Sequence, residues 1–135
     1  MPVRVLATSL YGLVAVLFLV AGAAVLLLGT GLLPGAVRDI ITAVVPNDGE
    51  TLHIAQEYAC LLVFIGLITL WFIRHYEASR AFHWAMTAFW ALIALVHWFD
   101  IRGPVESVVG PLINTVPFAL FLAVGLLRET TRGRA

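Results

Sequence analysis

Four polar side chains at helical spacing open a long apolar run, in the stretch HIAQEYAC. They are His53, Gln56, Glu57 and Cys60. His53 and Glu57 are four residues apart and Cys60 lies two turns beyond His53, so these three share one helix face. Ionisable side chains inside a membrane helix are costly unless paired, and they mark functional sites by default. This stretch therefore forms one half of a candidate site.

A second polar group ends another apolar run, in HWFD, where His97 and Asp100 share a helix face. If the two runs fold back on each other about a turn near Glu77, His97 comes level with Glu57, and Asp100 with His53 or Ile54. Asn114 lies about one and a half turns into the next run. We therefore predict a cluster at the outer end of a helix bundle, with Gln56 as a further ligand-binding candidate: His53, Glu57, Cys60, His97, Asp100 and Asn114.

Three chemistries fit this cluster. Two imidazoles and two carboxylates could bind zinc, copper or iron, and the candidate metal ligands are His53, Glu57, His97 and Asp100. Glu57 and His97 are the candidate catalytic residues for acid–base work on a lipophilic substrate. The cluster could instead bind a quinone or a lipid head group. A structural alternative also stands, in which Glu57 and His97 tie two helices together and His53 and Asp100 are solvated at the membrane interface.

A haem site is disfavoured by the spacing of the histidines. His83 and His97 are about 21 Å apart along one helix, a separation that could hold two stacked haems. The opposing ligands would be His53 and His75, which are about 33 Å apart and match poorly. We expect His83 to be an interfacial histidine beside Trp84.

The composition is that of a membrane protein. Of the 135 residues, 61% are hydrophobic and 12% are charged, against about 25% charged in soluble domains. The formal net charge is zero, and the absence of a basic stripe argues against a nucleic-acid partner. The single cysteine excludes an internal disulfide and any CxxC motif. No change of composition divides the chain, so we predict one domain over residues 1–135.

Four apolar runs are long enough to cross a bilayer, which takes about 20 helical residues. They predict an all-α, integral membrane four-helix bundle with spans at about 5–33, 52–73, 81–99 and 108–127. Arginines are enriched on the cytoplasmic side of membrane proteins. Here Arg38 and Arg102 fall on one side of the four spans, and the other six fall opposite, so both termini are expected in the cytoplasm of a bacterial inner (plasma) membrane: Arg4, Arg74, Arg80, Arg128, Arg132 and Arg134.

Two further patterns concern packing and the first loop. Small residues recur every seven positions along the first span and predict a seam for a left-handed helix crossing: Thr8, Ala15, Gly22 and Gly29. The first outer loop carries an apolar stripe that predicts a short interfacial helix before Pro46: Val37, Ile40, Ile41 and Val44.

The layout resembles that of the small four-helix bacterial membrane proteins grouped as DoxX-like. The likeness lies in a glycine-rich first span opening with SLYGLVAVLFLVAG, and in a second span with an early glutamate, QEYACLLVFIGL. A short arginine-bearing turn and a fourth span follow. Some members are associated with respiratory quinone or sulfur redox complexes, so the resemblance implies a quinone-linked or accessory role.

Two functions from different classes are consistent with the sequence. The first is an accessory subunit or a lipophile- or quinone-binding module, acting as a homo-oligomer or within a larger membrane complex in the lipid bilayer. The second is a membrane oxidoreductase or isomerase that uses Glu57 and His97 with a metal, haem or quinone. A transporter or channel is less well supported, because no helix carries a continuous polar stripe.

Overall fold

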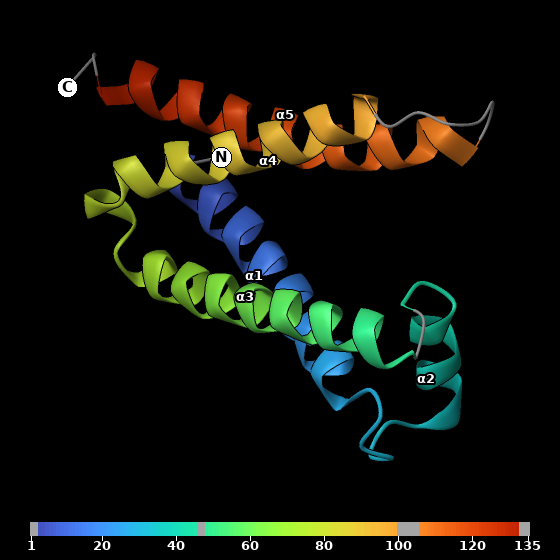
Figure 1. Cartoon of the computed structure of the whole chain (residues 1–135). Coiled ribbons are helices and arrows are strands. Elements are labelled where there is room, and N and C mark those ends of the chain that lie inside the picture. Colours follow the sequence, from blue (N-terminus) through green and yellow to red (C-terminus); the bar gives the residue numbers. More distant parts are fainter. Residues whose placement is uncertain (1–2, 46–47, 100–105, 133–135) are drawn as a thin grey trace. The chain divides into compact units, whose positions relative to one another are not determined.

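The structure, a computed structural model, describes residues 3–45, 48–99 and 106–132. All the secondary-structure elements of its described part are helices, as predicted (Figure 1). The elements in chain order are α1 (Val3–Leu27), α2 (Gly35–Thr42), α3 (Gly49–Arg74), the 3₁₀ turn η1 (Tyr76–Ala78), α4 (Arg80–Phe99) and α5 (Glu106–Arg132).

Four of these helices are long and apolar enough to cross a membrane, as in a multi-pass membrane protein. They are α1, α3, α4 and the Val108–Thr131 part of α5, and they contain 25, 26, 20 and 24 residues. Each exposes large apolar side chains, among them Leu13, Phe64, Leu92 and Ile113. An exposed apolar face is expected where lipid rather than water surrounds a helix.

The first helix is shorter than predicted. The expected span to residue 33 is wrong, because α1 ends at Leu27. Gly29 and Gly31 have φ angles of +90° and +77°, a left-handed conformation that glycine adopts readily. The Thr30 hydroxyl donates to the carbonyl of Leu27 at 2.7 Å. The chain therefore leaves α1 at Leu27, within an uninterrupted apolar run.

The third helix begins at Gly49, three residues before the predicted start. An Asp48 carboxylate oxygen accepts a hydrogen bond from the backbone N–H of Thr51 at 2.9 Å, as an N-cap residue does. This hydrogen bond holds the pKa of Asp48 below its ordinary value of 3.8. This N-cap explains why Gly49 and Glu50, which we predicted in the loop, already belong to α3.

The short helix predicted in the first loop is present as α2. Its Arg38 guanidinium donates to the carbonyl of Leu33 at 3.2 Å. None of the α2 residues is buried, and Val37 and Ile40 expose their apolar side chains. The helix is therefore confirmed, whereas its place at the membrane interface stays a prediction.

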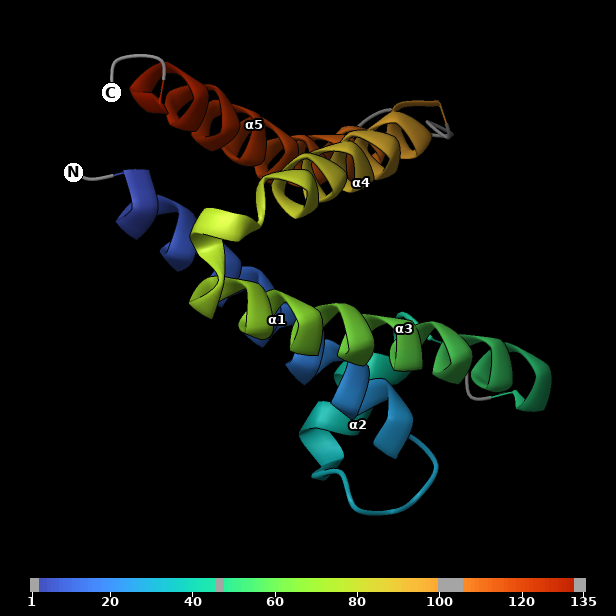
Figure 2. The same ribbon diagram turned by 90° about the vertical axis from the view of Figure 1, so that its left-hand side faces the viewer.

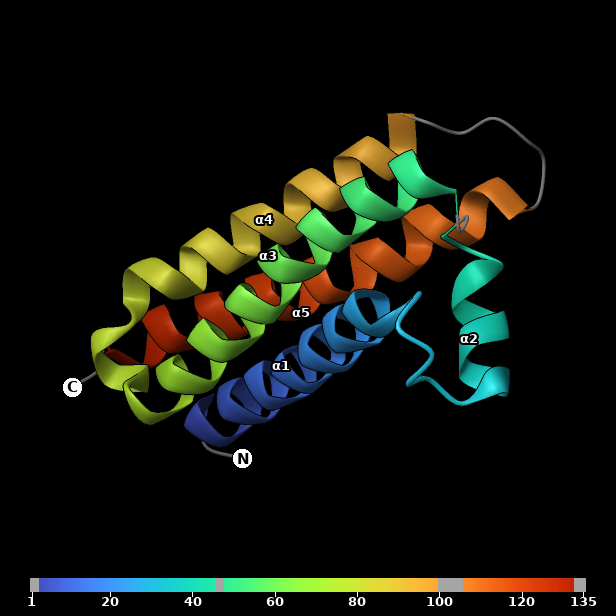
Figure 3. The same cartoon turned by 60° about the horizontal axis from the view of Figure 1, so that its bottom comes forward.

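The chain divides into two compact units, one of residues 11–74 and one of residues 1–10 with 75–135. In the first unit α1 and α3 approach closely at glycines (Figure 3). A Cβ atom at Gly22 would lie 2.9 Å from the Ala59 carbonyl oxygen, and one at Gly66 would lie 3.2 Å from that of Ala15. Ala15 and Gly22 are thus contact positions, as the predicted seam requires.

In the second unit α4 and α5 lie side by side and run antiparallel (Figures 1 and 2). Their contact buries apolar side chains together with two polar ones, His83 and Thr87. The buried apolar residues of these helices include Met86, Trp90, Ala94, Phe121 and Val124. Helix α5 is continuous through Pro111 and Pro117 and extends beyond the predicted 108–127 at both ends.

Candidate functional site

The α3 half of the predicted site presents an imidazole beside a carboxylate. His53 Nε2 lies 3.4 Å from Glu57 Oε1, and their side chains are 74% and 69% exposed. The predicted sharing of a helix face is therefore confirmed for this pair. Even a fully charged pair that is this exposed stabilises a protein by only about 0–1 kcal/mol. Stability alone thus gives little reason to place both groups in a membrane helix.

Gln56 has a structural partner. Its side-chain amide donates to the carbonyl of Leu28 at 3.4 Å, just past the end of α1. That carbonyl lies next to the left-handed Gly29, where the regular helical hydrogen bonds have ended. Cys60 is a free thiol and is exposed on α3. Among the four polar residues of HIAQEYAC, Gln56 thus ties α3 to α1, whereas His53, Glu57 and Cys60 face outward.

The α4 half centres on His97, whose ring is held by its own helix. Nδ1 lies 2.8 Å from the carbonyl oxygen of Ile93. A carbonyl oxygen only accepts hydrogen bonds, so Nδ1 carries the proton and donates. In the neutral ring Nε2 is then the acceptor. His97 is exposed, and the neutral ring is suited to accept a hydrogen bond from a ligand hydroxyl.

His97 and Asn114 meet at Gly110 on α5. The Asn114 amide donates to the Gly110 carbonyl at 2.8 Å, and a Cβ atom at Gly110 would lie 3.5 Å from His97 Cδ2. The Trp98 indole N–H donates to the Thr115 hydroxyl at 3.0 Å and ties the two helices together. The structure therefore brings two of the predicted site residues into one neighbourhood.

An apolar groove runs along α4 and ends at His97. Its volume is about 280 Å³, and it is lined by Phe89, Leu92, Ile93, Val96 and His97. Small-molecule sites are typically apolar with a few polar groups. This groove combines four apolar side chains with one imidazole, a lining suited to a lipophilic ligand with a polar end.

The two halves of the predicted cluster belong to different compact units. The placement of Glu57 level with His97 therefore stays a prediction. Asp100 lies outside the described residues. Within residues 3–45, 48–99 and 106–132, no group of three or more His, Cys, Asp or Glu side chains could hold a metal ion.

Comparisons with family models, with curated proteins and with solved structures all found no match. The resemblance in layout to DoxX-like proteins consequently stays a prediction, and the chemistry of the site has to be argued from its own residues.

His83 is buried, so the expectation of an interfacial histidine is wrong. Its side chain is 1% exposed, and Nε2 donates to the Phe121 carbonyl at 2.9 Å. Gly125 makes this contact possible, because a Cβ atom there would lie 2.8 Å from His83 Nε2. Trp84 does pack edge-on against the ring, at 5.8 Å between centroids. His83 is therefore a helix–helix tie between α4 and α5.

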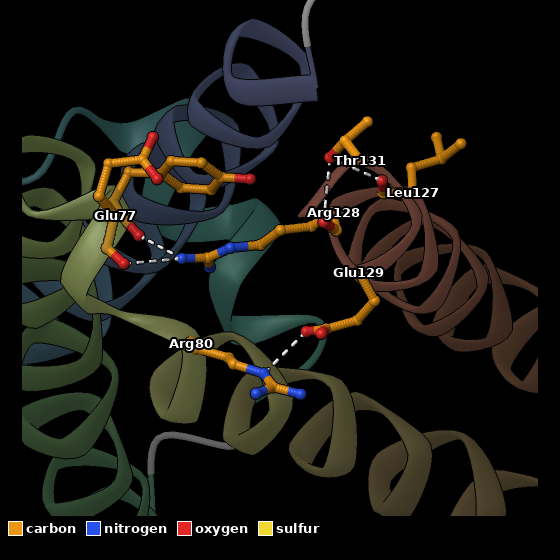
Figure 4. Close-up of polar contacts among 7 residues, drawn as sticks. Glu77, Arg80, Leu127, Arg128, Glu129 and Thr131 are labelled. Carbon is orange, nitrogen blue, oxygen red and sulfur yellow. Dashed lines mark hydrogen bonds and ion pairs between the residues drawn. The ribbon is translucent and has the colours of Figure 1, made fainter. Parts of the chain in front are cut away.

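Arg128 is a buried polar residue that the sequence reasoning missed. Only 3% exposed, it reaches from α5 to η1, where Nη2 donates to the carbonyls of Tyr76 at 2.7 Å and Glu77 at 3.1 Å (Figure 4). The guanidinium also lies 4.3 Å from the centroid of the Tyr76 ring. Nearby, Arg80 Nε is 2.8 Å from Glu129 Oε1 (Figure 4). Both arginines therefore fasten the start of the α4 hairpin to α5.

Part of this arrangement follows from the sequence if α4 and α5 form a hairpin. Folding them about a loop near residue 104 brings Arg80 level with residue 128 and His83 level with Gly125. We predicted a hairpin only for the second and third spans. The carbonyl partners of His83 and Arg128 would still have escaped it, because every residue carries a carbonyl.

Proposed function

We propose that the protein is a small membrane-embedded module that binds a lipophilic ligand of the quinone type, as an accessory subunit or a homo-oligomer. The observation that carries this proposal is the groove along α4, apolar over its length and ending at an imidazole. A quinone has the same order of chemical parts, a polar ring head and an apolar tail.

The hydrogen-bonding state of His97 favours the reduced, hydroxyl-bearing form of such a ligand. Its Nδ1–H is used by the Ile93 carbonyl, so the neutral ring offers Nε2 as an acceptor. Asn114 uses one amide N–H on the Gly110 carbonyl and keeps its second N–H and its carbonyl oxygen for a ligand. A quinol hydroxyl can donate to His97 Nε2, whereas a quinone carbonyl cannot.

Binding can be tested with two matched variants of α4. Leu92 lines the groove, whereas Leu95, one helical turn further on, is exposed but does not line it. Leu92→Trp should weaken binding of a short-chain benzoquinol, measured by titration of the detergent-purified protein under argon. Leu95→Trp should leave it unchanged. Equal affinities for both variants and the unaltered protein would reject the groove as the binding site.

The proposed setting is a four-helix bundle in a bacterial inner membrane, with both termini in the cytoplasm and α2 at the outer interface. The arginine distribution supports this orientation, with six of eight arginines on the proposed cytoplasmic side. The exposed apolar side chains of α2 support its contact with lipid. A fluorescent-protein fusion to the C-terminus should fluoresce, and a periplasmic-reporter fusion there should be inactive.

A membrane oxidoreductase or isomerase is the second candidate function. The pairing of His53 Nε2 with Glu57 Oε1 at 3.4 Å supports it, because an imidazole oriented by a carboxylate can act in general acid–base catalysis. In this candidate function Glu57, in contact with His53, would act together with His97, and the approach of Glu57 to His97 is part of the proposal. Glu57→Gln and His97→Ala variants that keep full cellular function would eliminate this candidate.

A further inference from the structure

A second groove lies at the C-terminal end of α3. It has a volume of about 410 Å³ and is lined by Leu70, Trp71, Ile73 and Arg74. This volume falls within the range of about 300–1,000 Å³ that is usual for small-molecule pockets. Three of its four lining side chains are apolar and the fourth is a guanidinium. It is separate from the α4 groove in both residues and unit.

The charge of Arg74 is available to a ligand. Arg80 pairs with Glu129, Arg128 donates to two carbonyls, and Arg38 donates to another. For Arg74, by contrast, no ion pair or side-chain hydrogen bond is made to the part of the chain that the structure describes, and the residue is exposed. A guanidinium is always charged and binds phosphate through two parallel hydrogen bonds.

The position of the groove indicates which phosphate it meets. Arg74 is the last residue of α3, a helix long and apolar enough to cross a membrane. Trp71 lies one turn inside that end and is 56% exposed. Tryptophan is enriched at the head-group level of a bilayer. In a bilayer spanned by α3 we therefore expect the guanidinium at head-group depth and the apolar part of the groove beside the acyl chains.

We propose that this groove binds one anionic phospholipid. Its phosphate contacts the Arg74 guanidinium, and one acyl chain lies along Leu70 and Ile73 beside Trp71. The carbonyl end of a helix repels anions, so the phosphate is held by the side chain beyond the helix end and not by the backbone. An anionic head group is preferred over a zwitterionic one, because each basic residue near the surface strengthens attraction to anionic lipid about fivefold.

The test uses the full chain, delipidated in a neutral maltoside detergent and titrated with dioleoylphosphatidylglycerol under native mass spectrometry. We expect one tightly bound lipid per protein. Arg74→Gln should weaken it by about fivefold or more. Arg4→Gln is the matched control, because it removes the same charge from an exposed arginine on the same predicted side that does not line the groove, and it should weaken binding less than Arg74→Gln does.

A second variant separates the groove from the charge. Leu70→Trp fills the apolar part and keeps Arg74, so it should also lower occupancy. Because Leu70 is 41% exposed, a larger side chain there should leave the fold intact. Leu70→Trp therefore tests the groove even if the Arg74→Gln protein misfolds. Equal losses in Arg74→Gln and Arg4→Gln, or unchanged binding in Leu70→Trp, would overturn the proposal. So would equal binding of dioleoylphosphatidylcholine, or full displacement of the lipid by millimolar inorganic phosphate, which would identify a free-phosphate site.

Discussion

The contact between α1 and α3 yields a quantitative prediction about Gly22. An alanine Cβ there would lie 2.8 Å from Val63 Cγ2, 2.9 Å from the Ala59 carbonyl oxygen and 3.2 Å from the Val63 backbone nitrogen. Two of these three atoms belong to the backbone of α3 and cannot rotate away. The helices must therefore separate locally by about half an ångström, from 2.9 Å to the 3.4 Å at which ordinary contact begins.

The expected loss follows from two opposing effects. Overpacking a well-packed contact costs about 1–3 kcal/mol, whereas alanine in place of glycine favours a helix by about 0.5–1 kcal/mol. The net free energy of unfolding of Gly22→Ala should thus fall by about 1–2 kcal/mol, which changes the unfolding equilibrium roughly 5–30-fold. Ala59 is the buried neighbour of Cys60 on α3, so this contact also fixes the rotation that turns Glu57 and Cys60 outward.

Two other glycines of the same unit provide the controls. At Gly12 the nearest atom to an added Cβ is Ile73 Cδ1 at 4.0 Å, which is ordinary contact, so Gly12→Ala should be neutral or slightly stabilising. At Gly66 the closest atom belongs to the Leu19 side chain, which can shift, so Gly66→Ala should fall between the two. The order of stability of the three variants can be measured by unfolding in mixed micelles with increasing dodecyl sulfate, followed by tryptophan fluorescence. A Gly22→Ala protein as stable as Gly12→Ala would refute the close approach.

Three further predictions concern the hairpin and the start of α3. Gly125→Ala would place a methyl group 2.8 Å from His83 Nε2, so unfolding in dodecyl sulfate should show a loss of about 0.5–1.5 kcal/mol as this hydrogen bond breaks. Arg128→Gln should cost about 1.5–3 kcal/mol in the same assay, because its hydrogen bonds come from a charged group, whereas the exposed pair of Arg80 makes Arg80→Gln cost at most about 1 kcal/mol. The capping N–H at the start of α3 keeps the pKa of Asp48 below its ordinary value of 3.8. Because a lowered carboxyl pKa stabilises the fold above that ordinary value, thermal unfolding should show a penalty for Asp48→Ala at neutral pH that disappears as the pH falls through the lowered pKa.

The sequence was sufficient to predict the four long helices, because a bilayer demands about 20 apolar residues from each. It was not sufficient to predict where α1 ends. The run stays free of charged residues as far as Leu33, so the absence of charge does not mark the end of the helix that the left-handed backbone of Gly29 and Gly31 makes. Helix boundaries set by backbone conformation inside an apolar run are therefore beyond a composition argument.

Contacts within one helix could be predicted from the sequence, whereas contacts between helices could not. The contact of His53 with Glu57 follows from helix geometry, because residues four apart are neighbours on one face. The burial of His83 depends instead on the Phe121 carbonyl and on the missing side chain of Gly125, both on another helix. Such a partner has no side-chain signature, so the sequence presented His83 as an ordinary interfacial residue.

The polar side chains of these helices fall into two groups by how they are satisfied. His83, Thr87 and Arg128 are buried and donate to carbonyls of the same unit. Two of them join elements, because His83 ties α4 to α5 and Arg128 ties α5 to η1. Polar groups without such partners in an apolar setting are costly and are retained at functional sites.

The second group contains His53, Glu57 and His97, which remain exposed in helices that are long and apolar enough to cross a membrane. The hydrogen bond of His97 to Ile93 fixes its ring and leaves Nε2 as an acceptor, and the contact between His53 and Glu57 is too exposed to be retained for stability. Side chains that are held in place and still have hydrogen-bonding atoms exposed are suited to bind a ligand. This contrast supports the proposal that a ligand meets the protein at these residues and along the α4 groove, while the buried polar residues hold the helices in place.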